Sequence, residues 1–150
     1  MELVPVDRAA RDAALRGDLG GRPVAPGWPH DDSPSALGFL DAGGWVFWIV
    51  DDDGRVAGEC GTKRAPDAVG AVEVCYGLAP GSRGRGLGTR AVAELVDWLS
   101  RQPAVRTIEA EVHVGNTASR RILERVGLHQ VSSSADGYLR YRAPTFTRSE

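Results

Sequence analysis

The segment GLAPGSRGRGLGTRAVAELVDWL, residues 77–99, constrains the fold of this chain more than any other part of the sequence. Glycines recur at short intervals in its first half. In its second half, apolar residues follow one another four, four and three positions apart, at Leu87, Ala91, Leu95 and Trp98. This spacing predicts an amphipathic helix, which Pro103 would end. A glycine-rich loop that leads directly into a helix indicates a place where the backbone comes close to something other than protein.

The start of the predicted helix has the properties of an anion-binding site. The first N–H groups of a helix have no partners within it, and the aligned peptide dipoles place partial positive charge there. Arginine side chains in the loop add charge that suits phosphate oxygens. We therefore predict a pyrophosphate site built from Arg83, Gly84, Arg85, Gly86, Leu87, Gly88 and Thr89. The alternative is an ordinary glycine-rich loop with solvated arginines, because short glycine patterns also arise by chance.

Two common nucleotide-binding folds fit this loop less well. A P-loop needs Gly-Lys-Ser or Gly-Lys-Thr, which the sequence lacks. A dinucleotide-binding fold needs its glycines after the first strand of a parallel βαβ unit, whereas this loop follows several predicted strands.

The pattern of elements along the chain predicts one α+β domain over residues 1–150, with a mixed, mostly antiparallel sheet crossed by a few helices. Alternating and β-branched runs predict strands at residues 1–6, 45–51, 55–63, 71–79, 107–114, 129–134 and 138–143. Besides the helix at the glycine loop, helices are expected at residues 8–16, after the N-cap Asp7, at 35–40 and at 116–127. No repeat or linker divides the sequence.

Composition and charge exclude several classes of protein. With 42% hydrophobic and 25% charged residues and a formal net charge of −2, the sequence is typical of a globular domain without a general attraction to nucleic acid or anionic membrane. No segment reaches the ~20 apolar residues of a membrane span, and the N-terminal segment lacks a signal-peptide core, so we expect a cytoplasmic protein. Cys60, Cys75, His113 and His129 lack metal-ligand spacing, so we expect no metal and structural roles for both histidines.

Three motifs in the second half resemble those of the GNAT superfamily of N-acetyltransferases. RGRGLGT fits the R/Q-x-x-G-x-G/A signature, and NTASRRILERVGL, from Asn116, is similar to N-x-x-S-x-R-x-L-E-x-x-G-F of the branch with ribosomal-protein N-terminal acetyltransferases. VEVCYGLAP likewise resembles that branch's E-I-G-Y-x-L-x-P strand. The resemblance extends over residues 72–128, with the motifs in the family's order and spacing.

The resemblance implies a twisted sheet whose two central parallel strands splay apart in a V, about four flanking helices, and acetyl-CoA bound in the gap. Tyr76, Gly77 and Leu78 match the strand that pairs with the pantetheine arm. Asn116 and Ser119 match positions near the reactive end of the cofactor, although Asn116 can also be read as a helix N-cap and Ser119 as a surface residue. Dimers are common in this family, so a homodimer is also compatible with it.

The implied activity is direct transfer of acetyl from acetyl-CoA to a primary amine, on a peptide N-terminus or a small molecule, in a ternary complex. Glu73 and Glu111 match positions where relatives carry a general base, with Glu73 slightly favoured; both can instead be solvent-facing strand residues. A base that works near neutral pH needs a raised pKa, which burial can supply. The alternative is a catalytically inactive protein that binds CoA as a sensor or scaffold.

The family's usual acid is missing, because Leu123 stands where many relatives have a tyrosine, and we expect Leu123 in the core. Ser119, Tyr138 or Tyr141 could protonate the leaving sulfur, or no acid is needed. On the acceptor side, the loop GWPHDDSP places Trp28, His30, Asp31 and Asp32 where GNAT folds bind their acceptors. Acidic residues there would attract an ammonium group, whereas the plainer reading is a solvated loop.

Overall fold

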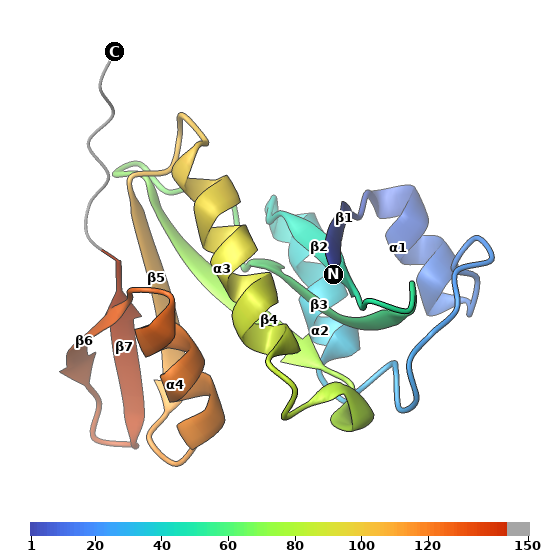
Figure 1. The fold of residues 1–150 in the computed structure, drawn as a ribbon. Helices are drawn as coiled ribbons and strands as arrows, with labels where there is room; N and C mark the ends of the chain where they lie inside the picture. The colour runs from blue at the N-terminus through green and yellow to red at the C-terminus, as the bar shows by residue number, and fades with distance from the viewer. Residues whose placement is uncertain (144–150) are drawn as a thin grey trace.

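The computed structural model describes residues 1–143, which form one seven-stranded sheet in the order β1-β2-β3-β4-β5-β7-β6 (Figure 1). The strands are β1 (Glu2–Pro5), β2 (Val46–Val50), β3 (Val56–Thr62), β4 (Ala71–Leu78), β5 (Thr107–His113), β6 (His129–Ser133) and β7 (Tyr138–Arg142). The helices are α1 (Arg8–Leu15), α2 (Ser33–Gly38), α3 (Leu87–Ser100) and α4 (Thr117–Arg125), with short 3₁₀ turns η1 (Phe39–Ala42) and η2 (Pro80–Ser82). Among the strands of residues 1–143, only β4 and β5 pair in parallel, which confirms the predicted α+β class and mostly antiparallel sheet.

Local sequence explains where the helices begin. The Asp7 carboxylate accepts a hydrogen bond from the Ala10 N–H at 2.7 Å, and so caps α1 as predicted. The helix expected at residues 35–40 begins earlier, at Ser33, because Pro34 suits the first turn of a helix. Gly86 has a left-handed φ of 79°, which lets the chain turn sharply into α3.

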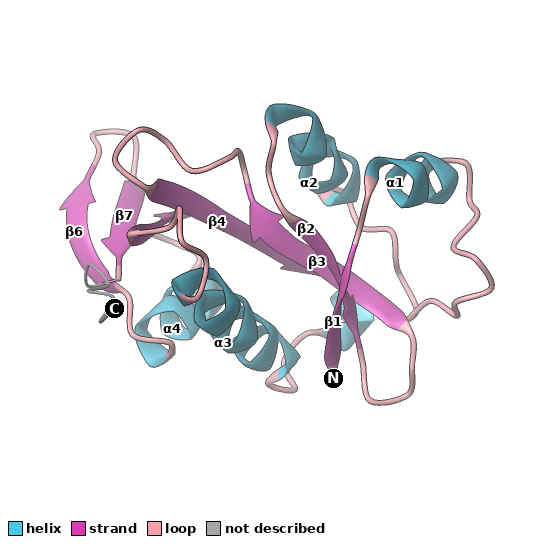
Figure 2. Ribbon diagram, turned by 90° about the horizontal axis from the view of Figure 1, so that it is seen from above, coloured by secondary structure: helices cyan, strands magenta, loops and turns pink. Residues whose placement is uncertain are grey.

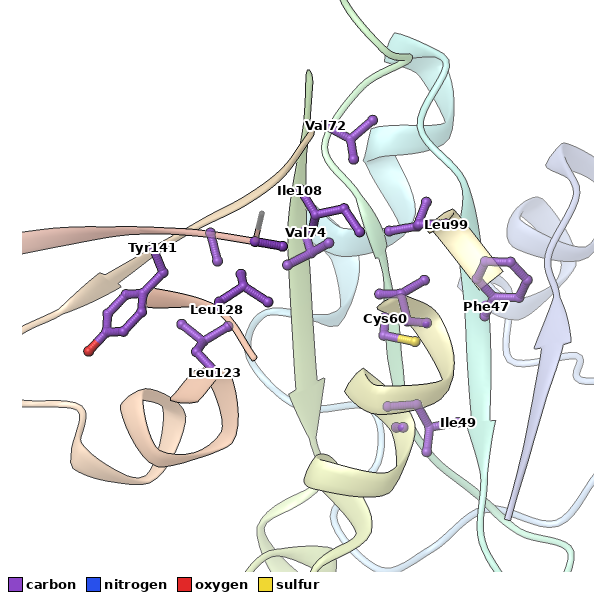
Figure 3. Packing of buried hydrophobic residues seen from close by; sticks show 14 of the residues in the cluster. Phe47, Ile49, Cys60, Val72, Val74, Leu99, Ile108, Leu123, Leu128 and Tyr141 are labelled. Atoms are coloured by element: carbon purple, nitrogen blue, oxygen red, sulfur yellow. The ribbon is translucent and has the colours of Figure 1, made fainter. Parts of the chain in front are cut away.

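The helices cover the sheet from both sides: α3 and α4 lie on one face and α1 and α2 on the other (Figure 2). The larger core lies beneath α3 and α4, where apolar side chains of β4 and β5 meet Leu99 and Leu123 (Figure 3). Leu123 is 1% exposed, so the prediction that it is a core residue is confirmed.

The central strands separate after a short parallel contact. Only three residue pairs join β4 to β5, from Ala71↔Thr107 to Glu73↔Glu109. Beyond them β4 stays paired with β3 as far as Leu78, and β5 stays paired with β7 as far as His113. Each strand therefore follows its antiparallel neighbour, and a V-shaped opening forms between the two (Figure 1).

Candidate functional site

A cavity of about 490 Å³ lies where β4 and β5 have separated. Its walls come from β3, β4, β5, the start of α4 and the segment around α2. Of the residues predicted for the site, it is lined by His30, Asp32, Tyr76, Gly77, Glu111, Asn116 and Ser119. Trp28, Asp31, Glu73 and Leu78 lie outside this lining.

The main chain of β4 faces the opening at alternate residues. The Glu73 carbonyl accepts from the Lys63 N–H and the Ala79 N–H donates to Ala57, so odd-numbered residues direct their polar groups toward β3. The Gly70 carbonyl accepts from Thr107, so even-numbered residues direct theirs toward the β5 side. The N–H groups of Tyr76 and Leu78 consequently point to the side where pairing with β5 has ended. This is the arrangement that an added extended chain requires.

The N-terminus of α3 presents unpaired donors beside the end of β4. The first hydrogen bond of the helix runs from the Arg90 N–H to the Gly86 carbonyl at 3.1 Å, and no side chain caps the helix. The N–H groups of Leu87, Gly88 and Thr89 therefore have no partner within the helix. The loop before it leaves open space at Gly84 and Gly86, where an added Cβ would meet nothing within 4 Å. These features fit a diphosphate.

The glycines and arginines of this loop have different local roles. Gly88 is buried, and a Cβ there would lie 3.0 Å from Ile122 Cδ1, so its missing side chain allows α3 to pack closely on α4. The Arg83 Nε donates to the Leu78 carbonyl at 3.2 Å, and the Arg85 guanidinium contacts the Gly81 carbonyl. Both arginines are exposed; Arg83 holds the loop to the end of β4, and Arg85 holds it to the 3₁₀ turn η2.

Two hydroxyl groups meet at the start of α4. The Tyr76 Oη lies 2.5 Å from the Ser119 Oγ, and Ser119 also donates its N–H to Asn116 Oδ1 at 3.1 Å. Asn116 is thus the N-cap of α4, which was one of its two interpretations from the sequence, and it also lines the cavity. Burial raises the pKa of Tyr76, although its bond to Ser119 acts in the opposite direction. Tyr76 therefore keeps its proton near neutral pH.

The two tyrosines predicted as alternative acids lie differently. Tyr141 is buried in the core, where its Oη donates to Glu124 Oε1 at 3.2 Å. Tyr138 lines the cavity and packs edge-on against His113.

Both predicted carboxylates belong to a network of ion pairs across β4, β5 and β7. Glu73 contacts the Lys63 ammonium and lies 3.6 Å from the Arg140 Nη1. Glu111 lies 3.2 Å from the Arg140 Nη2 and remains partly exposed at the cavity. Both carboxylates are therefore already engaged by cationic side chains.

Glu59, which the sequence analysis did not single out, is the most deeply buried acid of the site. It lies on β3, is 0% exposed and lines the cavity. Its Oε2 accepts from Trp28 Nε1 and from Ser33 Oγ, both at 3.0 Å. Its Oε1 is in close contact with His30 Nε2, and neither of these atoms has another partner among residues 1–143. Burial raises the pKa of Glu59 against the opposing effect of these donors.

The predicted acceptor residues therefore divide into two groups. Trp28 and His30 turn inward and bind Glu59, whereas Asp31 and Asp32 are exposed and only Asp32 lines the cavity. The available signal for Glu59 was its position as the lone acid in VAGECGT, a strand that is buried along its full length.

The cavity also holds Cys75, whose thiol is not reactive near neutral pH. Burial raises its pKa to about 12. A thiol that keeps its proton is a poor nucleophile, which is consistent with transfer that does not pass through this residue.

Within residues 1–143, no group of three or more His, Cys, Asp and Glu side chains is placed to hold a metal ion. No helix in that part of the chain combines the length and apolar character that a membrane span requires.

Comparison with known proteins agrees with this geometry. A family model described as an acetyltransferase (GNAT) domain matches residues 23–129, well over half of the chain. An uncharacterized N-acetyltransferase of Bacillus subtilis, YjdG, is 24% identical over 119 residues, which are 73% of this chain and 71% of YjdG.

Solved structures share the fold at low identity. RimL, a ribosomal alpha-N-protein acetyltransferase in complex with coenzyme A, has a TM-score of 0.69 and 15% identity, covering 96% of this chain and 93% of RimL. A spermidine N-acetyltransferase SpeG chimera from Vibrio cholerae and hSSAT has a TM-score of 0.68 and 15% identity, covering 96% of each chain. The family model, the splayed sheet and the motifs that surround it agree, and this chain belongs to the GNAT family of acetyltransferases.

Proposed function

We propose that this protein transfers an acetyl group from acetyl-CoA to a primary amine by direct attack in a ternary complex. The observation that carries the proposal is the opening between β4 and β5, with the N–H groups of Tyr76 and Leu78 directed into it. The donors at the start of α3 support it, because they fit a diphosphate beside the end of β4. Acetyl-CoA would supply the activated acetyl thioester, and the chain would bind it with residues 76–78, 84–89 and 116–119.

The hydroxyl pair at the start of α4 is placed to serve as the acid. In this proposal Ser119 donates a proton to the leaving sulfur and recovers one from Tyr76, which contacts it at 2.5 Å. Tyr76 then regains a proton from solvent, which has received the protons that the acceptor ammonium loses. Tyr76 would thereby replace the tyrosine that is absent at Leu123. The raised pKa of Tyr76 means that its proton is present when it is needed.

The acceptor is an amine of a peptide N-terminus or a small molecule. RimL and SpeG are described as acting on a protein alpha-amine and on spermidine, and both acceptors are primary amines. The exposed acids Asp32 and Glu111 at the cavity would favour an acceptor that arrives as an ammonium ion. The cytoplasmic location, the single-domain organisation and the homodimer remain predictions.

The direct test is release of free thiol from acetyl-CoA in the presence of a panel of amines, including spermidine and short peptides with free N-termini. We expect amine-dependent release and acetylated product by mass spectrometry. Tight binding of acetyl-CoA without turnover on any amine would contradict the proposal and favour a CoA sensor.

A second test addresses the diphosphate site. Arg83→Glu combined with Arg85→Glu should weaken acetyl-CoA binding by at least about tenfold, because each reversal turns phosphate attraction into repulsion. The matched control is Arg106→Glu, an exposed arginine in the loop beyond the other end of α3. Calorimetric titration with CoA measures the affinity of both variants. Equal affinity in the double variant and the control would show that the loop does not bind the diphosphate.

A further inference from the structure

The cavity between β4 and β5 is bordered by rings on both of its sides. Phe39 lines it from η1, directly after α2, whereas His113 and Tyr138 line it from the end of β5 and the start of β7. In the molecule, α2 and β7 lie on either side of β4 (Figure 2). A molecule that occupies the cavity would therefore meet an apolar ring from each part of the sheet.

His113 and Tyr138 belong to the face of the sheet that α4 does not cover. Their strand neighbours Val112 and Leu139 are buried in the core beneath α3 and α4. Successive side chains of a strand point to opposite faces, so the two rings lie on the face where α2 is found. An acceptor that approaches from this face would contact them before it reaches the opening between the strands.

The protein itself holds this ring pair in position. His113 Nδ1 accepts from the Gly115 N–H at 3.1 Å. The main chain of Tyr138 bonds to Ser134 twice, through its N–H to Oγ at 3.1 Å and through its carbonyl to the Ser134 N–H at 2.8 Å. The two rings pack edge-on with their centroids 5.3 Å apart, yet Tyr138 remains 41% exposed. A fixed but uncovered aromatic ring gains stability when an apolar group packs against it.

The charges around the cavity favour an acceptor with a single positive charge. In the lining, Glu111 pairs with Arg140 and Lys63 contacts Glu73. The buried carboxylate on β3 is enclosed by hydrogen-bond donors. Asp32 is exposed, and within residues 1–143 it has no ion-pair partner. One unpaired acid attracts one ammonium group and offers no second place for the further charges of a polyamine.

We propose that the acceptor is a monoamine whose amino group is attached to an apolar body, preferably an aromatic ring. This inference rests on the proposed function and names its substrate class. Asp32 would attract the ammonium group to the cavity, while Phe39 and Tyr138 would pack against the apolar body. An arylalkylamine and a peptide with an aromatic first residue share this chemistry.

Matched pairs of acceptors test the class in the thiol-release assay. The kcat/KM for phenethylamine should exceed that for ethylamine by about tenfold or more, because the ring adds apolar surface that the cavity can cover. Hexylamine should likewise exceed cadaverine, since a methyl group ends its chain where cadaverine carries a second ammonium group. Phe-Gly-Gly and Gly-Gly-Gly make the comparison for a peptide N-terminus, and the pair with the higher rates identifies the source of the acceptor.

Substitutions of Tyr138 connect this preference to the structure. Tyr138→Ala should raise the KM for phenethylamine about tenfold, and should change kcat and the KM for ethylamine by less than about threefold. Tyr138→Phe keeps the ring and should restore the low KM. Val131→Ala is the matched control, because Val131 is an exposed apolar residue of the neighbouring strand that lies outside the cavity lining.

A second measurement does not depend on turnover. The protein has three tyrosines, so the NMR signals of the Tyr138 ring can be assigned by comparison with Tyr138→Phe. In the presence of CoA, phenethylamine should shift these signals more than an equal concentration of ethylamine does, because a bound aromatic ring alters the local magnetic field. The ring of Tyr141, which is buried in the core, serves as the internal control.

The outcomes separate this inference from the proposed function. If the wild-type protein acetylates neither amines nor peptides, the proposed function fails. If it is active but prefers ethylamine, cadaverine and Gly-Gly-Gly to their apolar counterparts, the substrate class is wrong and the proposed function stands. Equal changes of KM in Tyr138→Ala and Val131→Ala would also overturn the inference. So would a loss of kcat on every amine in Tyr138→Phe, because the hydroxyl rather than the ring would then be required.

Discussion

At the scale of single residues, the acids of the site differ mainly in what surrounds them. Glu59 is enclosed by neutral donors and a histidine, and burial raises its pKa. Glu73 and Glu111 are enclosed by cations. Side chains of the same chemistry therefore lie in different surroundings, and substitutions can test which of them the reaction requires.

The first prediction concerns the two paired carboxylates. We expect Glu73→Gln and Glu111→Gln to lower kcat/KM by less than about tenfold each, because each change removes ion pairs that are partly exposed and weak. Steady-state kinetics on the amine that gives the highest turnover measures this. A loss of about 100-fold in either variant, with its pH dependence removed, would identify that residue as the base.

The second prediction follows from the raised pKa of Glu59. The folded state holds this proton more tightly than the unfolded chain does, so the contribution of Glu59 to stability is present at low pH. It is lost as the pH rises from the usual pKa of a glutamate through the raised value. The Tm difference between Glu59→Gln and wild type should therefore shift in favour of the variant as pH increases. Glu94→Gln, at an exposed position on α3, should show no such trend.

Glu59 also shows where inference from sequence stops at this scale. In RVAGECGTK the acid alternates with small and apolar residues, which is typical of a strand with one polar face. In the fold, its carboxylate accepts hydrogen bonds from Trp28 and Ser33, which lie 31 and 26 residues away in the sequence. Local periodicity carries no information about that contact. The acceptor loop itself was predicted from its position in the family.

At the scale of elements, helix starts were predictable because capping is local. Asp7 and Asn116 cap α1 and α4 through bonds that span three residues. The glycines before α3 were harder to separate, since Gly86 serves a left-handed turn and Gly88 serves packing against α4. Both look alike in the sequence, and only the position of Ile122 distinguishes them.

The third prediction tests this packing role. Gly88→Val should lower the free energy of unfolding by about 1–3 kcal/mol, because the new side chain would overlap Ile122. Combining it with Ile122→Ala should cost less than the sum of the two single changes. Denaturant unfolding of the four proteins gives the coupling energy, and strict additivity would show that the two residues do not compete for space.

At the scale of the whole molecule, the sheet is continuous on both sides of the opening but not across it. The splay of two central parallel strands was implied by the resemblance to the GNAT family, because the pairing of distant strands cannot be read from local periodicity. The point of separation, after Glu73↔Glu109, depends on both strands following their outer neighbours. No single segment of the sequence reveals it.

The fourth prediction concerns the groups in that opening. Adding CoA should slow amide hydrogen exchange at Tyr76 and Leu78, whose N–H groups face the β5 side. Cys75 and Gly77, which direct theirs toward β3, serve as internal controls and should change less. NMR exchange experiments resolve these neighbours, and equal protection of all four would indicate general tightening of the fold rather than a bound chain.

The short contact between β4 and β5 has a consequence for the life of the protein in a cell. Three residue pairs carry the whole strand-to-strand connection between β1–β4 and β5–β7. An extended ligand bound between β4 and β5 would contact both parts of the sheet and so stabilise their connection while it stays bound. The protein's resistance to proteases would then follow the metabolic supply of that ligand: molecules made during scarcity would be degraded sooner than identical molecules made during abundance.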